Sequence, residues 1–78
     1  MKETNAIQQA NELNREIGQR INKLRQAKGM SRAYLAEKIG ISVPHLGLIE
    51  RGERGVTNLK CIRLSVIFDV STDYILKG

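Results

Sequence analysis

The segment SRAYLAEKIGISVPHLGLIERG, residues 31–52, decides the fold of this chain. Its apolar residues recur at helical spacing on both sides of Gly40, which predicts two short helices joined by a tight turn. Ala36 is small at the point where the two helices are expected to cross most closely. The residues expected to close the core between the helices are Leu35, Ile39, Ile41, Leu46 and Ile49. The outer face of the second helix, which carries Arg51, is left exposed for a partner.

Capping residues mark where the helices are expected to begin. Ser31, Ser42, Ser71 and either Thr57 or Asn58 stand where N-caps are expected. Helices are therefore predicted over about residues 4–28, 31–39, 42–51, 57–68 and 71–77, with Thr4 as the first cap. A left-handed backbone is expected at the glycines that follow helical segments, namely Gly29, Gly40, Gly52 and Gly55. The fold class is all-α, a compact five-helix bundle.

The first predicted helix is unusually long. Its apolar positions share one face and comprise Ala6, Ile7, Ala10, Leu13, Ile17, Ile21 and Leu24. Gly18 lies within this helix and is expected to weaken it slightly. Residues 1–15 are predicted to form an N-terminal extension that continues into the first helix. Residues 16–78 are predicted to form one domain that contains the two-helix unit at 31–51.

Charge and composition narrow the function. The chain has 78 residues and a net charge of +5, and residues 15–63 hold eleven Lys/Arg against four Asp/Glu. A basic centre favours a polyanionic partner by counterion release. The single cysteine, Cys61, and the single histidine, His45, exclude an internal disulfide and a Cys/His metal cluster. Cys61 is expected in the core.

Several other functions are not expected. The sequence has no nucleophile–base constellation, phosphate-binding loop or metal motif, so we predict no enzyme activity, cofactor, metal or small-molecule ligand. It has no apolar run that could span a bilayer and no signal-peptide pattern at its N-terminus. The sequence therefore predicts a cytoplasmic protein without a membrane partner.

The predicted helix at 57–68 is apolar on two faces. Cys61, Leu64 and Phe68 form the face expected to join the core. A helix with a second apolar face has a second partner. This face and the last helix predict a homodimer contact made by Leu59, Ile62, Val66, Tyr74 and Ile75. The N-terminal extension, or deeper burial of the helix, are the alternatives.

Four sequence strings carry a resemblance to a known family. They are IGQRINKLRQAKGMS, LAEKIGIS, LIERG and FDVSTDYIL, within residues 17–76. Over this range the chain resembles the Cro/C1-type (XRE family) helix-turn-helix repressors. The resemblance implies a lambda-repressor-like bundle whose third helix enters the DNA major groove. It also implies a homodimer on a palindromic operator in double-stranded DNA.

The resemblance and the helical geometry together assign the site residues. The expected DNA contacts are Arg32, Ser42, Val43, Pro44, His45, Gly47, Leu48, Arg51, Arg54 and Asn58. Arg25 and Glu50 resemble a family pair that forms a partly buried salt bridge and fixes the third helix.

The third helix departs from the family pattern. Where polar residues are usual, this chain has Val43, Pro44, Gly47 and Leu48, whose side chains cannot hydrogen-bond base edges. Their expected contacts on DNA are thymine methyl groups, with specificity that is modest or carried partly by DNA shape. The alternative is a protein-interaction or antitoxin-like module that uses the same scaffold. The salt dependence of binding distinguishes the two functions, because DNA binding weakens steeply as salt rises and an apolar protein contact hardly changes. RNA binding is disfavoured by the lack of stacking aromatics.

Overall fold

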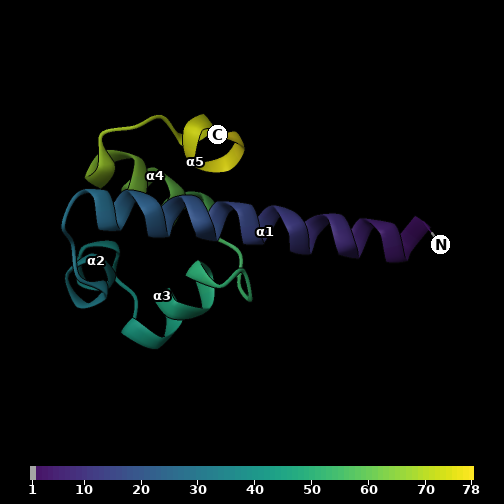
Figure 1. Ribbon diagram of the computed structural model, residues 1–78, viewed down its shortest axis with the longest axis horizontal. Helices are drawn as coiled ribbons and strands as arrows, with labels where there is room; N and C mark the ends of the chain where they lie inside the picture. Colours follow the sequence, from purple (N-terminus) through teal and green to yellow (C-terminus); the bar gives the residue numbers. More distant parts are fainter. Residues whose placement is uncertain (1) are drawn as a thin grey trace.

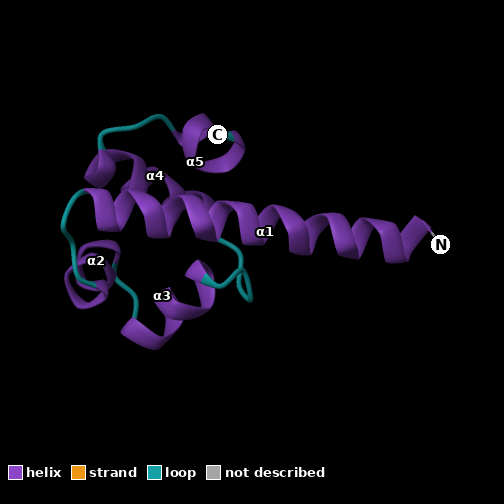
Figure 2. Cartoon of the chain, viewed as in Figure 1, coloured by secondary structure: helices purple, strands orange, loops and turns teal. Residues whose placement is uncertain are grey.

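The computed structural model describes the backbone of residues 2–78 and the side chains from residue 6 onward. This part of the chain contains five helices and no strand (Figures 1 and 2). The helices are α1 (Lys2–Ala27), α2 (Arg32–Ile39), α3 (Val43–Glu50), α4 (Asn58–Phe68) and α5 (Thr72–Lys77). The predicted all-α five-helix fold is therefore confirmed. None of the described helices is long and apolar enough to cross a membrane.

Four of the helices begin at the side-chain caps that the sequence predicts. Ser31, Ser42, Thr57 and Ser71 each accept a hydrogen bond from the backbone N–H three residues later. Each cap uses a backbone donor that has no partner inside the helix. These bonds fix where α2, α3, α4 and α5 begin.

Three details at the helix ends differ from the prediction. α1 begins at Lys2, so Thr4 lies inside its first turn rather than at its start, and the Thr4 side chain lies outside the described ones. Gly55 is not among the described residues with positive φ, because Gly52, with φ of 78°, already ends the turn after α3. Asp69, with φ of 55°, takes the left-handed position that ends α4, where glycine is the usual residue.

One apolar core joins all five helices. Its buried members are Ile21, Leu35, Ala36, Ile39, Leu46, Ile49, Cys61, Leu64, Phe68 and Ile75. Ala36 of α2 is 1% exposed, as expected for a small residue at a close contact between helices. Burial raises the pKa of the Cys61 thiol, which therefore stays protonated at neutral pH. The prediction that Cys61 lies in the core is confirmed.

The prediction that Ile75 lies on a dimer surface is wrong. Its side chain is completely buried in the core of the subunit. α5 packs against α1 and α4, and the Arg20 guanidinium of α1 donates hydrogen bonds to the carbonyl oxygens of Ile75 and Leu76, at 2.9 and 3.1 Å. A six-residue helix has too few positions for apolar spacing to show which side faces the core.

Helix α1 packs against the end of α3 and against α5. Gly18 lies at its contact with the end of α3, where an added Cβ would be 2.7 Å from the Glu50 carbonyl oxygen and still closer to that of Ile49. An added Cβ on Gly52 would likewise lie 2.6 Å from Cα of Arg15. Residues 6–13 are exposed and continue the helix away from the other four helices (Figure 1). The domain boundary near residue 15 stays a prediction.

Candidate nucleic-acid interface

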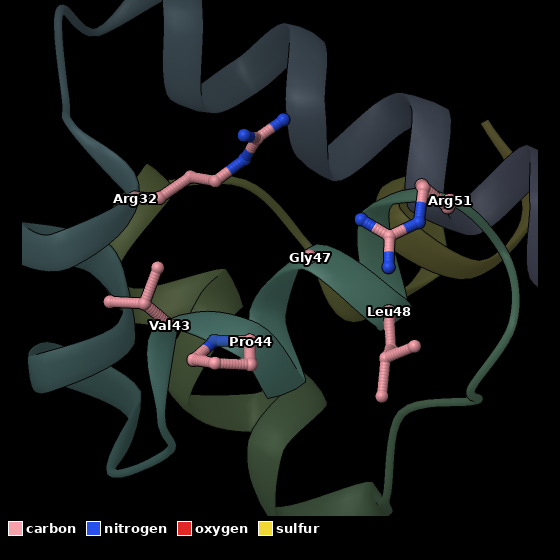
Figure 3. Close-up of a pocket in the computed structure, with 6 residues that line it drawn as sticks. All are labelled: Arg32, Val43, Pro44, Gly47, Leu48 and Arg51. Atoms are coloured by element: carbon pink, nitrogen blue, oxygen red, sulfur yellow. The ribbon is translucent and has the colours of Figure 1, made fainter.

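The outer face of α3 and the start of α2 surround an open hollow of about 410 Å³ (Figure 3). We call it the α3 hollow. It is lined by six of the predicted DNA contacts, Arg32, Val43, Pro44, Gly47, Leu48 and Arg51. The structure thus places Arg32 of α2 beside the predicted contact residues of α3. Three of these side chains carry only carbon atoms, and two carry a guanidinium group.

Arg51 is held across the surface of α3. It is the C-cap of the helix, and its Nε donates a hydrogen bond to Glu53 Oε2 at 2.5 Å. Its guanidinium lies against Gly47, because an added Cβ there would be 3.1 Å from Arg51 Nη1. Both side chains of the Arg51–Glu53 pair are more than half exposed, so the pair contributes little stability. Its effect is to orient Arg51 toward the α3 hollow. Glu53 was not among the site residues predicted from the sequence.

The carboxylate of Glu50 is the centre of a buried polar network. Arg25 Nε donates to Glu50 Oε2 at 2.7 Å and its Nη2 donates to Oε1 at 3.3 Å, which gives the predicted salt bridge. Arg32 Nε and Asn22 Nδ2 also donate to Oε1, at 2.9 and 3.0 Å. The Glu50 side chain is 2% exposed and that of Arg25 is 10% exposed. One carboxylate therefore ties α1 and the start of α2 to the end of α3.

The ionisation of Glu50 follows from this geometry. Burial raises the pKa of the carboxyl group, but the hydrogen bonds from Arg25, Arg32 and Asn22 outweigh it and hold the pKa below its ordinary value. Glu50 is therefore charged at neutral pH. A carboxylate with a lowered pKa in the folded state adds stability above its unfolded pKa, and this contribution is lost as the pH falls through the folded value.

Arg32 forms an ion pair with Glu50 that the sequence did not predict. Its Nε is bound to Glu50, yet its side chain is 49% exposed and lines the α3 hollow. Figure 3 shows the guanidinium groups of Arg32 and Arg51 on opposite sides of Gly47. The two cations therefore line the same hollow as the apolar side chains, and the Glu50 network fixes the position of one of them.

The four other predicted DNA contacts lie outside the α3 hollow. Ser42 Oγ accepts a hydrogen bond from the backbone N–H of His45, whose side chain is half-buried. Arg54 is exposed in the loop between α3 and α4. Asn58 lines a different hollow of about 280 Å³, between α4 and α5. Contacts of these residues with DNA stay predictions.

A second exposed surface is apolar. Leu59, Ile62 and Val66 of α4 are 57, 53 and 75% exposed, and Tyr74 of α5 is 45% exposed. The opposite face of α4 supplies Cys61, Leu64 and Phe68 to the core, so the predicted division of this helix into two apolar faces is confirmed. We call the exposed set the α4 stripe. Among the described side chains, no three His, Cys, Asp or Glu groups gather as a metal site would require.

Residues 21–75 match the family model described as helix-turn-helix. The chain therefore belongs to the helix-turn-helix family of Cro/C1-type (XRE) transcriptional regulators, which are not enzymes. It is 37% identical over 62 residues to the HTH-type transcriptional regulator YqaE of Bacillus subtilis, covering 80% of this chain and 53% of YqaE. The chain spans about half the length of the curated relatives it matches.

Two solved structures share the fold. The restriction–modification controller protein C.AhdI of Aeromonas hydrophila is 32% identical, with a TM-score of 0.73 over 80% of this chain and 94% of that one. The biofilm master regulator SinR, solved in complex with DNA, is 37% identical, with a TM-score of 0.72 over 78% of this chain and 98% of that one. These relatives support the assignment of α2 and α3 as the helix-turn-helix unit.

Proposed function

We propose that the chain is a sequence-specific DNA-binding regulator that represses transcription as a homodimer. In this proposal α3 of each subunit enters the major groove at one half-site of a palindromic operator, and occupancy of the promoter excludes polymerase. The observation that carries the proposal is the α3 hollow, flanked by two arginines and held in place by the Glu50 network. The structure of the relative SinR with DNA supports it. The expected cytoplasmic location stays a prediction.

Arg51 supplies the most direct test of DNA binding. Its guanidinium can bond a guanine edge or a phosphate through two nitrogens while Nε stays on Glu53. We expect Arg51→Ala to weaken binding to the selected operator by about 5- to 150-fold for each half-site, the range for one good bidentate contact. Binding is measured by fluorescence anisotropy at several salt concentrations, on an operator selected from random DNA.

The matched control is Lys23→Ala, which removes an exposed cation from α1 and changes net charge equally. This variant should bind the operator within about twofold of the parent, and circular dichroism should show unchanged helix content in both variants. Equal losses in the two variants would mean that Arg51 acts only through net charge. Failure of the parent to bind any DNA at low salt would reject the proposed function.

The α4 stripe supports the dimer part of the proposal. Leu59 and Ile62 are large, apolar and more than half exposed on neighbouring turns. Burying a carboxylate in an apolar contact is costly, so Leu59→Glu or Ile62→Glu should convert a dimer to a monomer in sedimentation velocity. Ile7→Glu, which changes a similarly exposed residue on α1, is the control and should leave the dimer intact. A dimer that survives both α4 substitutions uses another surface.

A protein partner for α3 is the competing function. The carbon-only side chains of Val43, Pro44 and Leu48 favour it, since they resemble an apolar docking surface. The salt series separates the two functions. Neutralising several phosphates makes affinity fall steeply with salt, whereas an apolar protein contact changes little.

A further inference from the structure

The α3 hollow has a chemical composition that selects among groups of the major groove. Val43, Pro44 and Leu48 present only carbon, and Pro44 also lacks a backbone N–H. Val43 is 43% exposed, so its methyl groups are accessible from outside. Gly47 has no side chain, so the Arg51 guanidinium can lie directly against the helix there. Base edges in the major groove present hydrogen-bonding groups and one apolar group, the methyl at C5 of a pyrimidine.

The charges around the hollow favour DNA over an apolar protein surface. Arg32 and Arg51 line it beside the apolar side chains, and their side chains are 49 and 59% exposed. An apolar partner would have to remove water from both guanidinium groups without replacing their hydrogen bonds, which is costly. Phosphates and guanine edges instead offer acceptors to both groups. The hollow is therefore suited to an apolar group that is surrounded by acceptors.

We propose that the α3 hollow binds the 5-methyl group of a pyrimidine in each half-site, so that the methyl group determines sequence preference. This inference rests on the proposed DNA-binding function. The methyl group packs against Val43, Pro44 and Leu48, while Arg51 bonds acceptors beside it. Thymine always carries this methyl group, whereas cytosine carries it only after methylation to 5-methylcytosine.

The size of the effect follows from the burial of one methyl group. Burying a group of this size changes an equilibrium constant about fourfold. Two half-sites in a palindrome would double this free energy, which corresponds to about 16-fold in affinity for the dimer. The effect is therefore large enough to measure and small enough to leave general DNA binding intact.

The experiment replaces each thymine of the selected operator, one symmetric pair at a time, by deoxyuridine. This change removes the methyl group and keeps every hydrogen-bonding group of the base. We expect one or two pairs of positions to lose about 16-fold in affinity. In a second arm, cytosine and 5-methylcytosine are compared at the same positions. Methylation should restore a similar factor, which distinguishes a methyl-binding hollow from a site specific to thymine.

A variant connects the effect to the hollow. Leu48→Ala removes most of one wall, so the ratio of thymine to deoxyuridine affinity should fall toward one. Leu13→Ala removes an exposed leucine from α1 and should preserve the ratio. Each ratio is measured on one protein sample, so a change in the folded fraction cancels.

The outcomes separate this inference from the function on which it rests. DNA binding with no sensitivity to any deoxyuridine substitution overturns the inference and leaves the proposed function intact. A sensitivity that Leu48→Ala does not change also overturns it, because the methyl group then lies elsewhere. Absence of DNA binding in the parent protein overturns both.

Discussion

Replacing Glu50 with glutamine is expected to lower the free energy of unfolding by about 3 kcal/mol, at the lower end of the range for breaking a buried ion pair. The substitution leaves the buried Arg25 guanidinium without a negative partner, and it replaces one of the two acceptor oxygens that Arg25 uses by an amide N–H donor, so one of these hydrogen bonds is lost. An amide keeps the size of the side chain, so packing is preserved. Urea denaturation followed by circular dichroism measures the change.

The exposed pair nearby provides the control. Glu53→Gln breaks the Arg51–Glu53 pair, whose side chains are more than half exposed, and should change stability by less than about 0.5 kcal/mol. The pH dependence adds an independent check on Glu50. Because its pKa is lowered in the folded state, the parent should lose its advantage over Glu50→Gln as the pH falls below about 4.3. A constant difference across that range would contradict the ionised network.

Gly18→Ala is expected to destabilise the chain by about 2 kcal/mol, although alanine is the better helix former. The added methyl group would collide with the backbone carbonyls of Ile49 and Glu50, so α1 and α3 would have to separate. Backbone atoms at the end of a capped helix cannot move aside as a flexible side chain can. Thermal and urea denaturation should both report the loss.

Gly47→Ala is the matched control because Gly47 also lies inside a helix. There the new methyl group would meet only the end of the flexible Arg51 side chain, at 3.1 Å. The better helix propensity of alanine should leave stability unchanged or raise it by up to about 1 kcal/mol. Similar losses in both variants would show that helix packing around Gly18 is not as close as the structure indicates.

Local sequence signals predicted the elements of this fold well. The hydroxyl caps at Ser31, Ser42, Thr57 and Ser71 act within three residues, so they fix helix starts without knowledge of the tertiary structure. The left-handed turn at Gly40 is local in the same way. Five of the six predicted contacts that line the α3 hollow belong to α3 and its C-cap, where helical spacing places them on one face, and only Arg32 comes from another helix. Their contact with DNA stays a prediction.

Interactions between distant segments were predicted less well. The bond from Arg32 to Glu50 joins residues 18 apart, and whether the side chains meet depends on the angle between α2 and α3. From the sequence, Gly18 was expected only to weaken a long helix. Its importance for packing could not be predicted, because it depends on the backbone carbonyls of α3 that lie against it. Ile75 was assigned to the wrong side because its burial is decided by the packing of α5 on α1 and α4.

The packing of α1 against both α3 and α5 has a consequence for the spacing of half-sites in the proposed operator. α1 contacts α3, where Arg25 holds Glu50, and it contacts α5, where Arg20 holds the last carbonyls. In a proposed pair joined through the α4 stripe, this frame would keep the two α3 helices at one separation. An extra base pair between half-sites shifts one of them by roughly 3.4 Å and rotates it by roughly 35°. A continuous helix bends little, so such a regulator would tolerate variation within its half-sites better than a change in their distance.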